Sequence, residues 1–245
     1  MTTKATLFDL NCKRFLYTQT RRRLLSAVLK QHASSVITLQ ECPDDMRGDL
    51  LADLGDDWRG INHHKVALFY DRTKWKLLHQ ESHNLRSPAT FSPRRFLLAE
   101  LYRLDTKDTL WVGTTHLTVH QPSSATWRKR QAEDIAGLVA GVANYPLAVG
   151  GDFNETGDSV RGILRNASGL SDLRRKAPPI TREEYDTHHN QDAVYDLAER
   201  TGSDWLDDWL TTPAVTVYSG ALIRTYKATD HNALLARVQF ERFTP

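Results

Sequence analysis

The chain has 245 residues, of which 40% are hydrophobic and 25% are charged, and its formal net charge is +2. This composition is typical of a globular protein and excludes an intrinsically disordered chain. No apolar run approaches the roughly 20 residues of a membrane-spanning helix, and the first residues lack the pattern of a signal peptide. We therefore expect a single domain over residues 1–245, a cytoplasmic location and a monomer.

Apolar runs separated by turn residues predict strands and helices that alternate along the chain. The expected strands are Ala5–Leu10, Val36–Leu39, Val66–Tyr70, Trp75–Leu78, Phe96–Leu104, Leu110–Thr115, Pro146–Val149, Trp205–Thr211, Val215–Ser219 and Ala233–Phe240. The expected helices are Tyr17–Gln31, Asp44–Leu54, Ser124–Val142 with Ser124 as N-cap, and Ser159–Ala167, and Leu170–Asp192 is expected to be a long loop. Hairpin-like strands interleaved with helices favour two packed sheets with helices outside over one doubly wound parallel sheet.

Polar side chains mark one end of five predicted strands. These residues are Asn11, Glu41, His116, the pair Asp152 and Asn154, and the pair Asp230 and His231. Each motif alone is weak, because Asp, Asn and His are also common in turns and caps. Their repetition at five strand ends is informative, because α/β proteins usually carry their chemistry at such edges. The sequence therefore predicts one shared site.

The order of these motifs along the chain is more specific than any one of them. It runs Asn11, Leu39-Gln40-Glu41, Thr114-Thr115-His116-Leu117, Gly151-Asp152-Phe153-Asn154, Asp207 and Asp230-His231. This order resembles the endonuclease/exonuclease/phosphatase superfamily, the DNase I-like metal-dependent phosphodiesterases, from residue 6 to residue 238. The resemblance implies an α/β fold in four α/β/β/α layers. Two mixed sheets would pack face to face with helices outside, and the site would lie at one end of them.

The resemblance also implies a divalent cation, Mg²⁺ with Mn²⁺ as a possible substitute. Glu41 would be the principal metal ligand, supported by Asn11 and Asp230. The chemistry agrees, because Mg²⁺ prefers one or two carboxylates together with water and phosphate oxygens. Some members of the superfamily place an Asp two residues after the first-strand Asn. Here that position is Lys13, so metal binding should depend more heavily on Glu41.

The remaining motif residues would act on the scissile phosphate. By resemblance, Asp152 and Asn154 would orient the attacking water and the phosphate. His116 and His231 would form hydrogen bonds to the phosphate, where negative charge builds up in the transition state. These four residues, together with Asp207, are the predicted catalytic group.

His231 also needs a carboxylate partner, which would raise the imidazole pKa and fix its tautomer. By resemblance this partner comes from the strand that contains Leu206-Asp207-Asp208-Trp209-Leu210, and Asp207 is the favoured residue. Asp204 and Asp208 are alternatives, because a slip of one residue turns a strand side chain to the other face.

Three neighbours of the motif residues have no predicted chemical role. Cys12 and Cys42 are too few for a disulfide framework or a Cys-rich zinc site. We expect both to be buried as small apolar side chains. Glu155 follows the Gly-Asp-Phe-Asn run and adds a carboxylate to which the sequence assigns no function.

The substrate class is the least defined feature, because fold analogy does not choose among nucleases, phosphatases and phospholipid-cleaving enzymes. Arg95 and Arg174 are the best candidates for phosphate contacts. Tyr185 lies in a loop similar to one in some relatives, including tyrosyl-DNA phosphodiesterases and sphingomyelinase-like enzymes, and a purely structural loop is the alternative. A mildly basic chain with a pI of about 8.5 favours a nuclease that acts on DNA or RNA by in-line attack of water on phosphorus. A phosphatase or phosphodiesterase of a small molecule or lipid headgroup is the alternative, and a catalytically silent scaffold is third.

Overall fold

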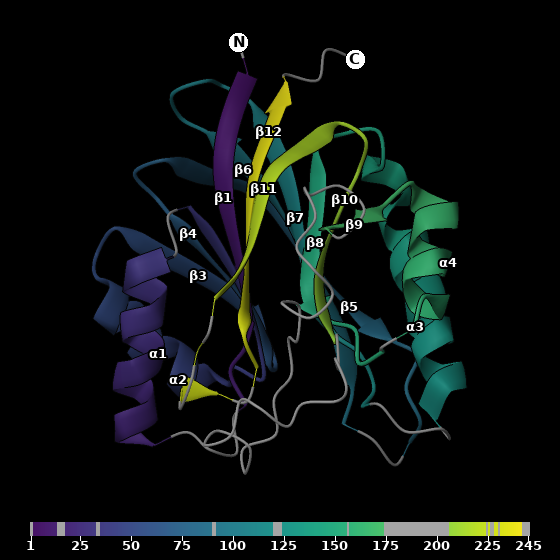
Figure 1. Ribbon diagram of the computed structural model, residues 1–245, viewed down its shortest axis with the longest axis horizontal. Helices are drawn as coiled ribbons and strands as arrows, with labels where there is room; N and C mark the ends of the chain where they lie inside the picture. Colours follow the sequence, from purple (N-terminus) through teal and green to yellow (C-terminus); the bar gives the residue numbers. More distant parts are fainter. Residues whose placement is uncertain are drawn as a thin grey trace.

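The computed structural model describes residues 2–13, 18–32, 35–89, 92–119, 124–155, 157–173, 206–223, 225, 228–229 and 231–241. These residues form two six-stranded sheets that lie face to face between two layers of helices (Figure 1). Helices α1 (Gln19–His32) and α2 (Asp44–Leu54) cover the first sheet. Helices α3 (Ala125–Val139) and α4 (Ser159–Ser168) cover the second. The predicted four-layer α/β/β/α sandwich is confirmed.

Both sheets are mixed. In spatial order, the first consists of β11 (Val215–Ile223), β12 (Ala233–Glu241), β1 (Thr2–Asn11), β2 (Val36–Gln40), β4 (Val66–Asp71) and β3 (Trp58–His63). The second consists of β5 (Trp75–Leu85), β6 (Arg94–Arg103), β7 (Thr109–His116), β8 (Leu147–Asp152), β10 (Asp207–Thr211) and β9 (Ser171–Asp172).

Each sheet has one parallel strand pair, β1 with β2 and β7 with β8. A parallel pair needs a crossover connection, which α1 provides in the first sheet and α3 in the second. The carboxyl ends of paired parallel strands lie at the same edge. As a result, Asn11 lies beside Gln40, and His116 lies beside Asp152.

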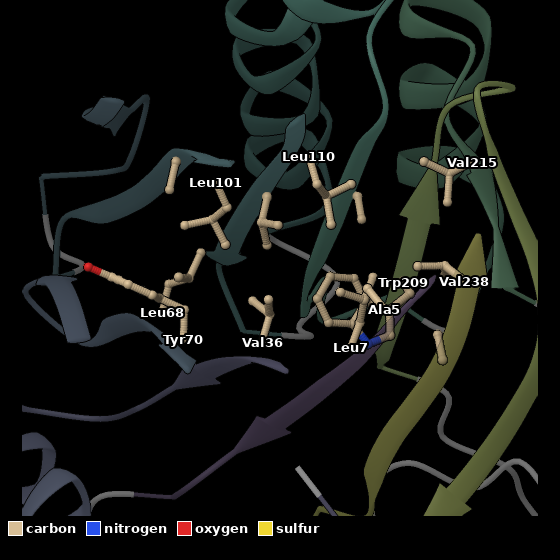
Figure 2. Close-up of a cluster of buried hydrophobic side chains, with 14 of the residues drawn as sticks. Ala5, Leu7, Val36, Leu68, Tyr70, Leu101, Leu110, Trp209, Val215 and Val238 are labelled. Atoms are coloured by element: carbon tan, nitrogen blue, oxygen red, sulfur yellow. The ribbon is translucent and has the colours of Figure 1, made fainter. Parts of the chain in front are cut away.

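Three apolar layers hold the sandwich together. The layer between the sheets contains Leu7, Val36, Leu110 and Trp209 (Figure 2). Two outer layers lie between each sheet and its helices. Successive strand side chains point to opposite faces, so a central strand must be apolar on both faces to contribute to two of these layers. This requirement explains the continuous apolar runs in the sequence.

The predicted helices and strands are present, and the errors concentrate at the sheet edges. Strands β5 and β11 extend to Leu85 and Ile223, beyond the predicted ends, and β3 and β9 were not predicted. All four are edge strands, whose one-sided burial leaves no clear apolar run. Most of the predicted loop lies outside the described residues, but β9 falls within its first part.

Ser124 occupies the N-cap position of α3, as predicted, but its side chain does not cap the helix. Its hydroxyl makes no capping hydrogen bond to the helix and instead donates to the carbonyl oxygen of Val119 at 2.6 Å. The same hydroxyl accepts a hydrogen bond from Arg128 Nη1 at 2.7 Å. The hydroxyl of Ser124 therefore connects the segment before α3 to a side chain in the first turns of the helix.

An ion pair between α1 and α2 gives the first testable prediction. Two nitrogens of Arg22 each lie 2.8 Å from a carboxylate oxygen of Asp53, and Ser26 Oγ donates to the same carboxylate at 2.6 Å. The hydrogen bonds from Arg22 and Ser26 lower the pKa of Asp53 to about 2. A lowered pKa in the folded state means that the stabilisation is fully present above the ordinary carboxyl pKa. It is lost as pH falls towards about 2.

We expect Asp53→Asn to lower Tm by roughly 2–4 °C near neutral pH, since the pair is partly exposed and screened by solvent. The difference from wild type should shrink as pH falls through the acid range, which thermal unfolding followed by circular dichroism can measure. Asp49→Asn is the matched control, because Asp49 contacts the same Arg22 at 3.0 Å and is more exposed. Equal Tm values for Asp53→Asn and wild type at neutral pH would contradict this account.

Candidate active site

At one end of the sandwich, the strand faces that point toward the opposite sheet change from apolar to polar. In β1, for example, Leu7 belongs to the core between the sheets, and Asp9 and Asn11 follow on the same face. The same change occurs in β2, β7, β8 and β10, and the polar side chains on these faces are Thr38, Gln40, Thr114, His116, Asp152 and Asp207. This end lies opposite to the paired residues Thr2 and Glu241 (Figure 1). Asn11, His116, Asp152 and Asp207 of the predicted site therefore converge there.

Three buried side chains form the centre of this region. His231 Nδ1 lies 2.6 Å from Asp207 Oδ2, and possible ligand atoms of Asp152, Asp207 and His231 all lie within 4.8 Å of one another. The three residues come from β8, β10 and the segment before β12. The structure thus makes the Asp207–His231 pair that the sequence favoured.

Asp152 connects this centre to the other motif residues. Its Oδ2 accepts a hydrogen bond from Asn11 Nδ2 at 2.8 Å and lies 3.5 Å from His116 Nε2. Its Oδ1 accepts from the backbone N–H of Asn154 at 2.8 Å. Burial raises the pKa of Asp152 to about 6, and the negative charge of Asp207 adds to the rise. Two carboxylates held this close together disfavour each other's ionised form, so the site suits a positive ligand.

His116 has a lowered pKa, which favours its neutral form. Burial is the largest cause that lowers the pKa of His116 well below its ordinary value, followed by the positive charges of Arg94, His231 and Lys65. A neutral imidazole has one donor and one acceptor nitrogen, so His116 can donate either to Asp152 or to a further group, but not to both at once.

Glu41 and Asn154 share a backbone conformation that few residues adopt. Both have a φ of 52°, in the left-handed region that disfavours side chains with a Cβ. Such a conformation costs of order 1–3 kcal/mol and persists where the surrounding structure enforces it, often at functional sites. Here the Cys42 N–H, just after Glu41, donates to the Lys65 carbonyl at 2.9 Å, and the Asn154 N–H donates to Asp152. Glu41 directly follows Gln40, the last residue of β2 and the strand partner of Asn11, and its side chain is partly exposed.

A buried polar network that the sequence analysis missed lies under the site. Asp9 Oδ1 accepts hydrogen bonds from Thr38 Oγ1 at 2.5 Å and from Gln40 Nε2 at 2.8 Å. Gln40 Nε2 also donates to Thr114 Oγ1 at 3.0 Å, which links the two sheets. Burial raises the pKa of Asp9 well above its ordinary value, and the negative charges of Asp207 and Asp152 add to the rise. The available signal was Asp9 itself, a charged residue inside an apolar run and two positions before Asn11, which places both side chains on the same face of the strand.

Gly150 allows the sheets to approach at this network. A Cβ at Gly150 would lie 2.6 Å from Thr38 Oγ1 and 2.9 Å from Asp9 Oδ1, which is closer than real contacts permit. The absence of a side chain at this position therefore lets β8 carry Asp152 up to the facing strands.

Asp208, the alternative partner for His231, has a different role. It lies on the opposite face of β10, where its Oδ2 accepts a hydrogen bond from Arg161 Nε of α4 at 2.8 Å. Both side chains of this ion pair are almost fully buried. Asp204, the other alternative, lies outside the described residues. The position of Trp209 in the core between the sheets places Asp207, not Asp208, on the face of the site.

This pair gives a prediction that separates folding from chemistry. Asp208→Asn should lower the free energy of unfolding by about 3–5 kcal/mol, because it leaves the buried Arg161 charge without its carboxylate. Urea unfolding measures this loss. The double variant Arg161→Met with Asp208→Asn removes both charges and should recover part of the stability. A loss below about 1 kcal/mol in the single variant would contradict the assignment.

Glu155 precedes helix α4, and its side chain binds the N-terminal end of that helix. Its Oε2 accepts a hydrogen bond from the backbone N–H of Val160 at 2.6 Å, and its Oε1 accepts from the hydroxyl of Ser159. A carboxylate at a helix N-terminus satisfies free N–H groups and interacts favourably with the helix dipole. The additional carboxylate of the sequence is thus a helix cap.

Both cysteines are buried and unpaired by disulfide, as predicted. A hydrogen bond with Cys42 and burial raise the pKa of the Cys12 thiol well above its ordinary value. Both effects disfavour the reactive thiolate.

Of the predicted substrate contacts, Arg95 alone is described, and Arg174, Tyr185 and the predicted metal ligand Asp230 lie outside the described residues. Arg95 Nη2 lies 3.0 Å from His64 Nε2. The neighbouring Arg94 opens β6, and the negative charges of Asp152 and Glu41 act on its guanidinium. Because it interacts electrostatically with Asp152 and Glu41, Arg94 is a further candidate for phosphate contacts beside Arg95.

A cavity of about 330 Å³ lies at the other end of the sandwich, next to Thr2 and Glu241. None of the described site residues lines it. This cavity therefore does not coincide with the candidate site at the polar strand ends.

Comparison with protein families agrees with this geometry. The family model described as "Endonuclease/Exonuclease/phosphatase family" matches residues 8–231, which is most of the chain. The chain belongs to this family. The match includes Asn11, Glu41, His116 and Asp152 and ends at His231. The predicted family is thus confirmed, whereas no curated protein matches the sequence.

Solved structures of the endonuclease/exonuclease/phosphatase family share the fold. A member from Bacteroides vulgatus is 20% identical with a TM-score of 0.83, over 98% of this chain and 100% of that chain. D. rerio TDP2 complexed with a single-strand DNA product is 18% identical with a TM-score of 0.79, over 96% and 99%. A mannosyl-6-phosphatase from Bacteroides thetaiotaomicron is 16% identical with a TM-score of 0.79, over 95% and 98%. At these identities the likeness establishes the fold and leaves the substrate open.

None of the described helices combines the length and the apolar character needed to cross a membrane.

Proposed function

We propose that this member of the family is a divalent-metal-dependent phosphodiester hydrolase that cleaves DNA or RNA by in-line attack of water on phosphorus. The observation that carries the proposal is the buried group of Asp152, Asp207 and His231, with Asn11 and His116 both near the Asp152 carboxylate. Carboxylates, an amide and two imidazoles at one point provide the groups that phosphoryl transfer requires, namely cation ligands and hydrogen-bond donors to phosphate oxygens.

The residues present fit a divalent cation. Asp152 and Asp207 are buried carboxylates that repel each other, and a cation between or beside them would remove that repulsion. Hard oxygen donors of this kind suit Mg²⁺, with Mn²⁺ as a substitute. We assign Glu41 as the principal ligand, supported by Asn11 and Asp230. Of these, Asn11 also donates a hydrogen bond to Asp152 at 2.8 Å. When bound, the cation would polarise the phosphoryl oxygens and neutralise their charge.

His231 and Asp207 act as a unit in this proposal. The hydrogen bond of 2.6 Å fixes the Nδ1 side of the ring toward Asp207, which leaves Nε2 as the atom that turns toward the phosphate. Asp207 would hold the ring in the orientation in which His231 forms a hydrogen bond to the phosphate, and this bond strengthens as negative charge builds up there. Asp207 is then a positioning residue and His231 the catalytic one.

Asp152, Asn154 and His116 would position the attacking water and the phosphate. Asp152 would accept a proton from the water at a carboxylate oxygen. Asn154 is fixed by its backbone N–H on Asp152 and by its side-chain Nδ2, which donates to the carbonyl of Leu117 at 3.1 Å. His116, as a neutral ring, would donate to a phosphate oxygen.

Two observations favour nucleic acid as the substrate. Lys65, Arg94 and Arg95 lie beside His116 and form a basic surface next to the catalytic group. In addition, a structural relative, D. rerio TDP2, is described with a single-strand DNA product. Arg174 and Tyr185 remain proposed contacts to phosphate and base. A monomer should suffice, since the cluster forms within one chain.

A phosphatase of a small phosphorylated molecule is the second candidate. The relative named mannosyl-6-phosphatase shows that this fold is associated with such an activity. A compact small substrate would need few of the basic residues beyond His116. The two candidates therefore differ in salt dependence, because polymer binding weakens steeply with salt through counterion release.

A panel of substrates tests the proposed function. Plasmid DNA, single-stranded DNA, RNA, a 5′-tyrosyl oligonucleotide, bis-p-nitrophenyl phosphate and inositol phosphates would be incubated with and without Mg²⁺ and Mn²⁺. We expect metal-dependent cleavage of at least one polymer, with a kcat/KM that falls steeply as salt rises. Cleavage of small phosphates alone would replace the nuclease assignment with the phosphatase, and no cleavage at all would indicate a scaffold.

A further inference from the structure

A cavity of about 240 Å³ lies directly beside the catalytic group. Its walls come from three separate elements: His64 and Lys65 in the turn between β3 and β4, Arg94 and Arg95 at the start of β6, and His116 at the end of β7. His116 lines this cavity, whereas the neighbouring site residues Asp152, Asp207, His231 and Asn11 do not. We call it the β6 pocket. It is therefore adjacent to the place where the scissile phosphate would bind, and not the same place.

The β6 pocket has a strongly positive lining. Lys65, Arg94 and Arg95 contribute three cations, two imidazoles join them, and none of its described lining residues is acidic. Burial lowers the pKa of Arg94, but the negative charges of Asp152 and Glu41 act in the opposite direction and favour its charged form. Cations on different elements, brought together by the fold, repel one another unless an anion lies between them.

Several donors in this lining also have no partner among the described residues. Arg94 Nε, Arg95 Nε, Arg95 Nη1 and His116 Nδ1 are buried nitrogens without a hydrogen bond there. A buried donor that loses its hydrogen bonds to water destabilises the protein unless something else accepts the bond. Arg95 is nonetheless held in place, through Nη2 and the ring of His64 at 3.0 Å. A guanidinium that is fixed but unsatisfied is suited to bind an anion with little further loss of entropy.

We propose that the β6 pocket binds a second phosphate of the substrate, the one next to the scissile phosphate along a nucleic acid strand. The inference rests on the proposed function, since it takes His116 as the boundary between the two phosphate positions. Lys65 and Arg95 would hold the second phosphate, and Arg94 would lie between it and the carboxylates of Asp152 and Glu41. Such a pocket makes the enzyme select substrates by the phosphate that it does not cleave.

Short dinucleotides test this selection. The thymidine dinucleotide TpT would be compared with the same dimer carrying an added 5′-phosphate or an added 3′-phosphate, in Mg²⁺. We expect one of the two phosphorylated dimers to have a kcat/KM higher than that of TpT by about ten- to a hundredfold, mainly through a lower KM. Which of the two is preferred reports the direction in which the strand runs across the site.

Variants locate the selection in the pocket. Lys65→Gln and Arg95→Gln should reduce the ratio of kcat/KM between the preferred dimer and TpT toward one. Lys4→Gln is the matched control, because Lys4 is exposed near the far end of β1 from Asn11, and it should retain the wild-type ratio. Circular dichroism of each variant checks that the fold is intact. A ratio that Lys65→Gln and Arg95→Gln leave unchanged would overturn the proposal.

The same comparison with inositol monophosphate and an inositol bisphosphate separates the possible sources of the second phosphate. A preference confined to the bisphosphate would overturn the nucleic acid strand as the source. Turnover of TpT at the same kcat/KM as both phosphorylated dimers would overturn the pocket and leave the proposed function standing.

If no substrate is cleaved, the proposed function fails, and the pocket is tested separately by binding. Inorganic phosphate should then raise the Tm of the metal-free wild-type protein and raise that of the Lys65→Gln, Arg95→Gln double variant much less. Equal shifts in the two proteins would overturn the pocket.

Discussion

Glu41→Gln abolishes the metal-dependent hydrolysis of every substrate that the wild-type protein cleaves, with a fall in kcat/KM of at least about a thousandfold. The change removes one negative charge from the residue that we assign as the principal cation ligand and keeps its shape. The side chain is partly exposed, and the left-handed backbone treats Gln and Glu alike. We therefore expect an unchanged Tm. Initial rates over a Mg²⁺ titration, with thermal unfolding of the same samples, measure both quantities.

Glu155→Gln is the control for this result. It also removes a carboxylate close in sequence to the site, but one that caps α4. We expect it to lower Tm and to leave Mg²⁺-dependent turnover by the folded protein in place. A Glu41→Gln protein with a near-normal rate in Mg²⁺ would remove Glu41 from the metal site.

His231→Ala should lower kcat by about a thousandfold and change KM little, because its contact with the phosphate strengthens mainly in the transition state. Asp207→Asn should lower kcat by a smaller factor, of the order of ten to a hundred, because it keeps a hydrogen-bond acceptor for Nδ1 but loses the negative charge that orients the ring and stabilises the transition state. Steady-state kinetics over a range of substrate concentrations separates kcat from KM.

The double variant decides whether Asp207 acts through His231. If it does, Asp207→Asn adds almost nothing once His231 is Ala, so the two effects are far from additive. Fully multiplicative effects would show that Asp207 has a separate role, for example as a metal ligand. A rise in KM without a fall in kcat for His231→Ala would make His231 a binding residue only.

The sequence predicted the central strands well because they are apolar on both faces. Strands β1, β2, β7 and β8 read as continuous apolar runs, and each ends in a polar residue of the site. The edge strands β3, β5, β9 and β11 were missed or cut short, since half-buried strands such as Trp58–His63 lack that signal. Edge position is a property of the sheet and is not visible in a local window.

In the site, the sequence predicted which strand face a side chain lies on better than it predicted the partner of that side chain. Asp207 contacts His231, as predicted, because Trp209 in the core fixes which strand face Asp207 lies on. The ion pair between Asp208 and Arg161 could not be predicted from the strand sequence alone, because Arg161 lies on α4. The roles of Glu155 and of the Asp9 network depend on partners that lie on other elements, such as Ser159, Thr38 and Thr114. Local sequence gives the face of a residue, and tertiary contacts give its partner.

The most direct test of the central claim is cleavage in water enriched in oxygen-18, with Mg²⁺ and the polymer that the wild-type protein cleaves. Attack of water on phosphorus at the group of Asp152, Asp207 and His231 predicts that the label enters the phosphate-bearing product, as mass spectrometry would show. Glu41→Gln and His231→Ala should abolish this incorporation. Label in the hydroxyl-bearing product, or cleavage that both variants retain, would contradict the account.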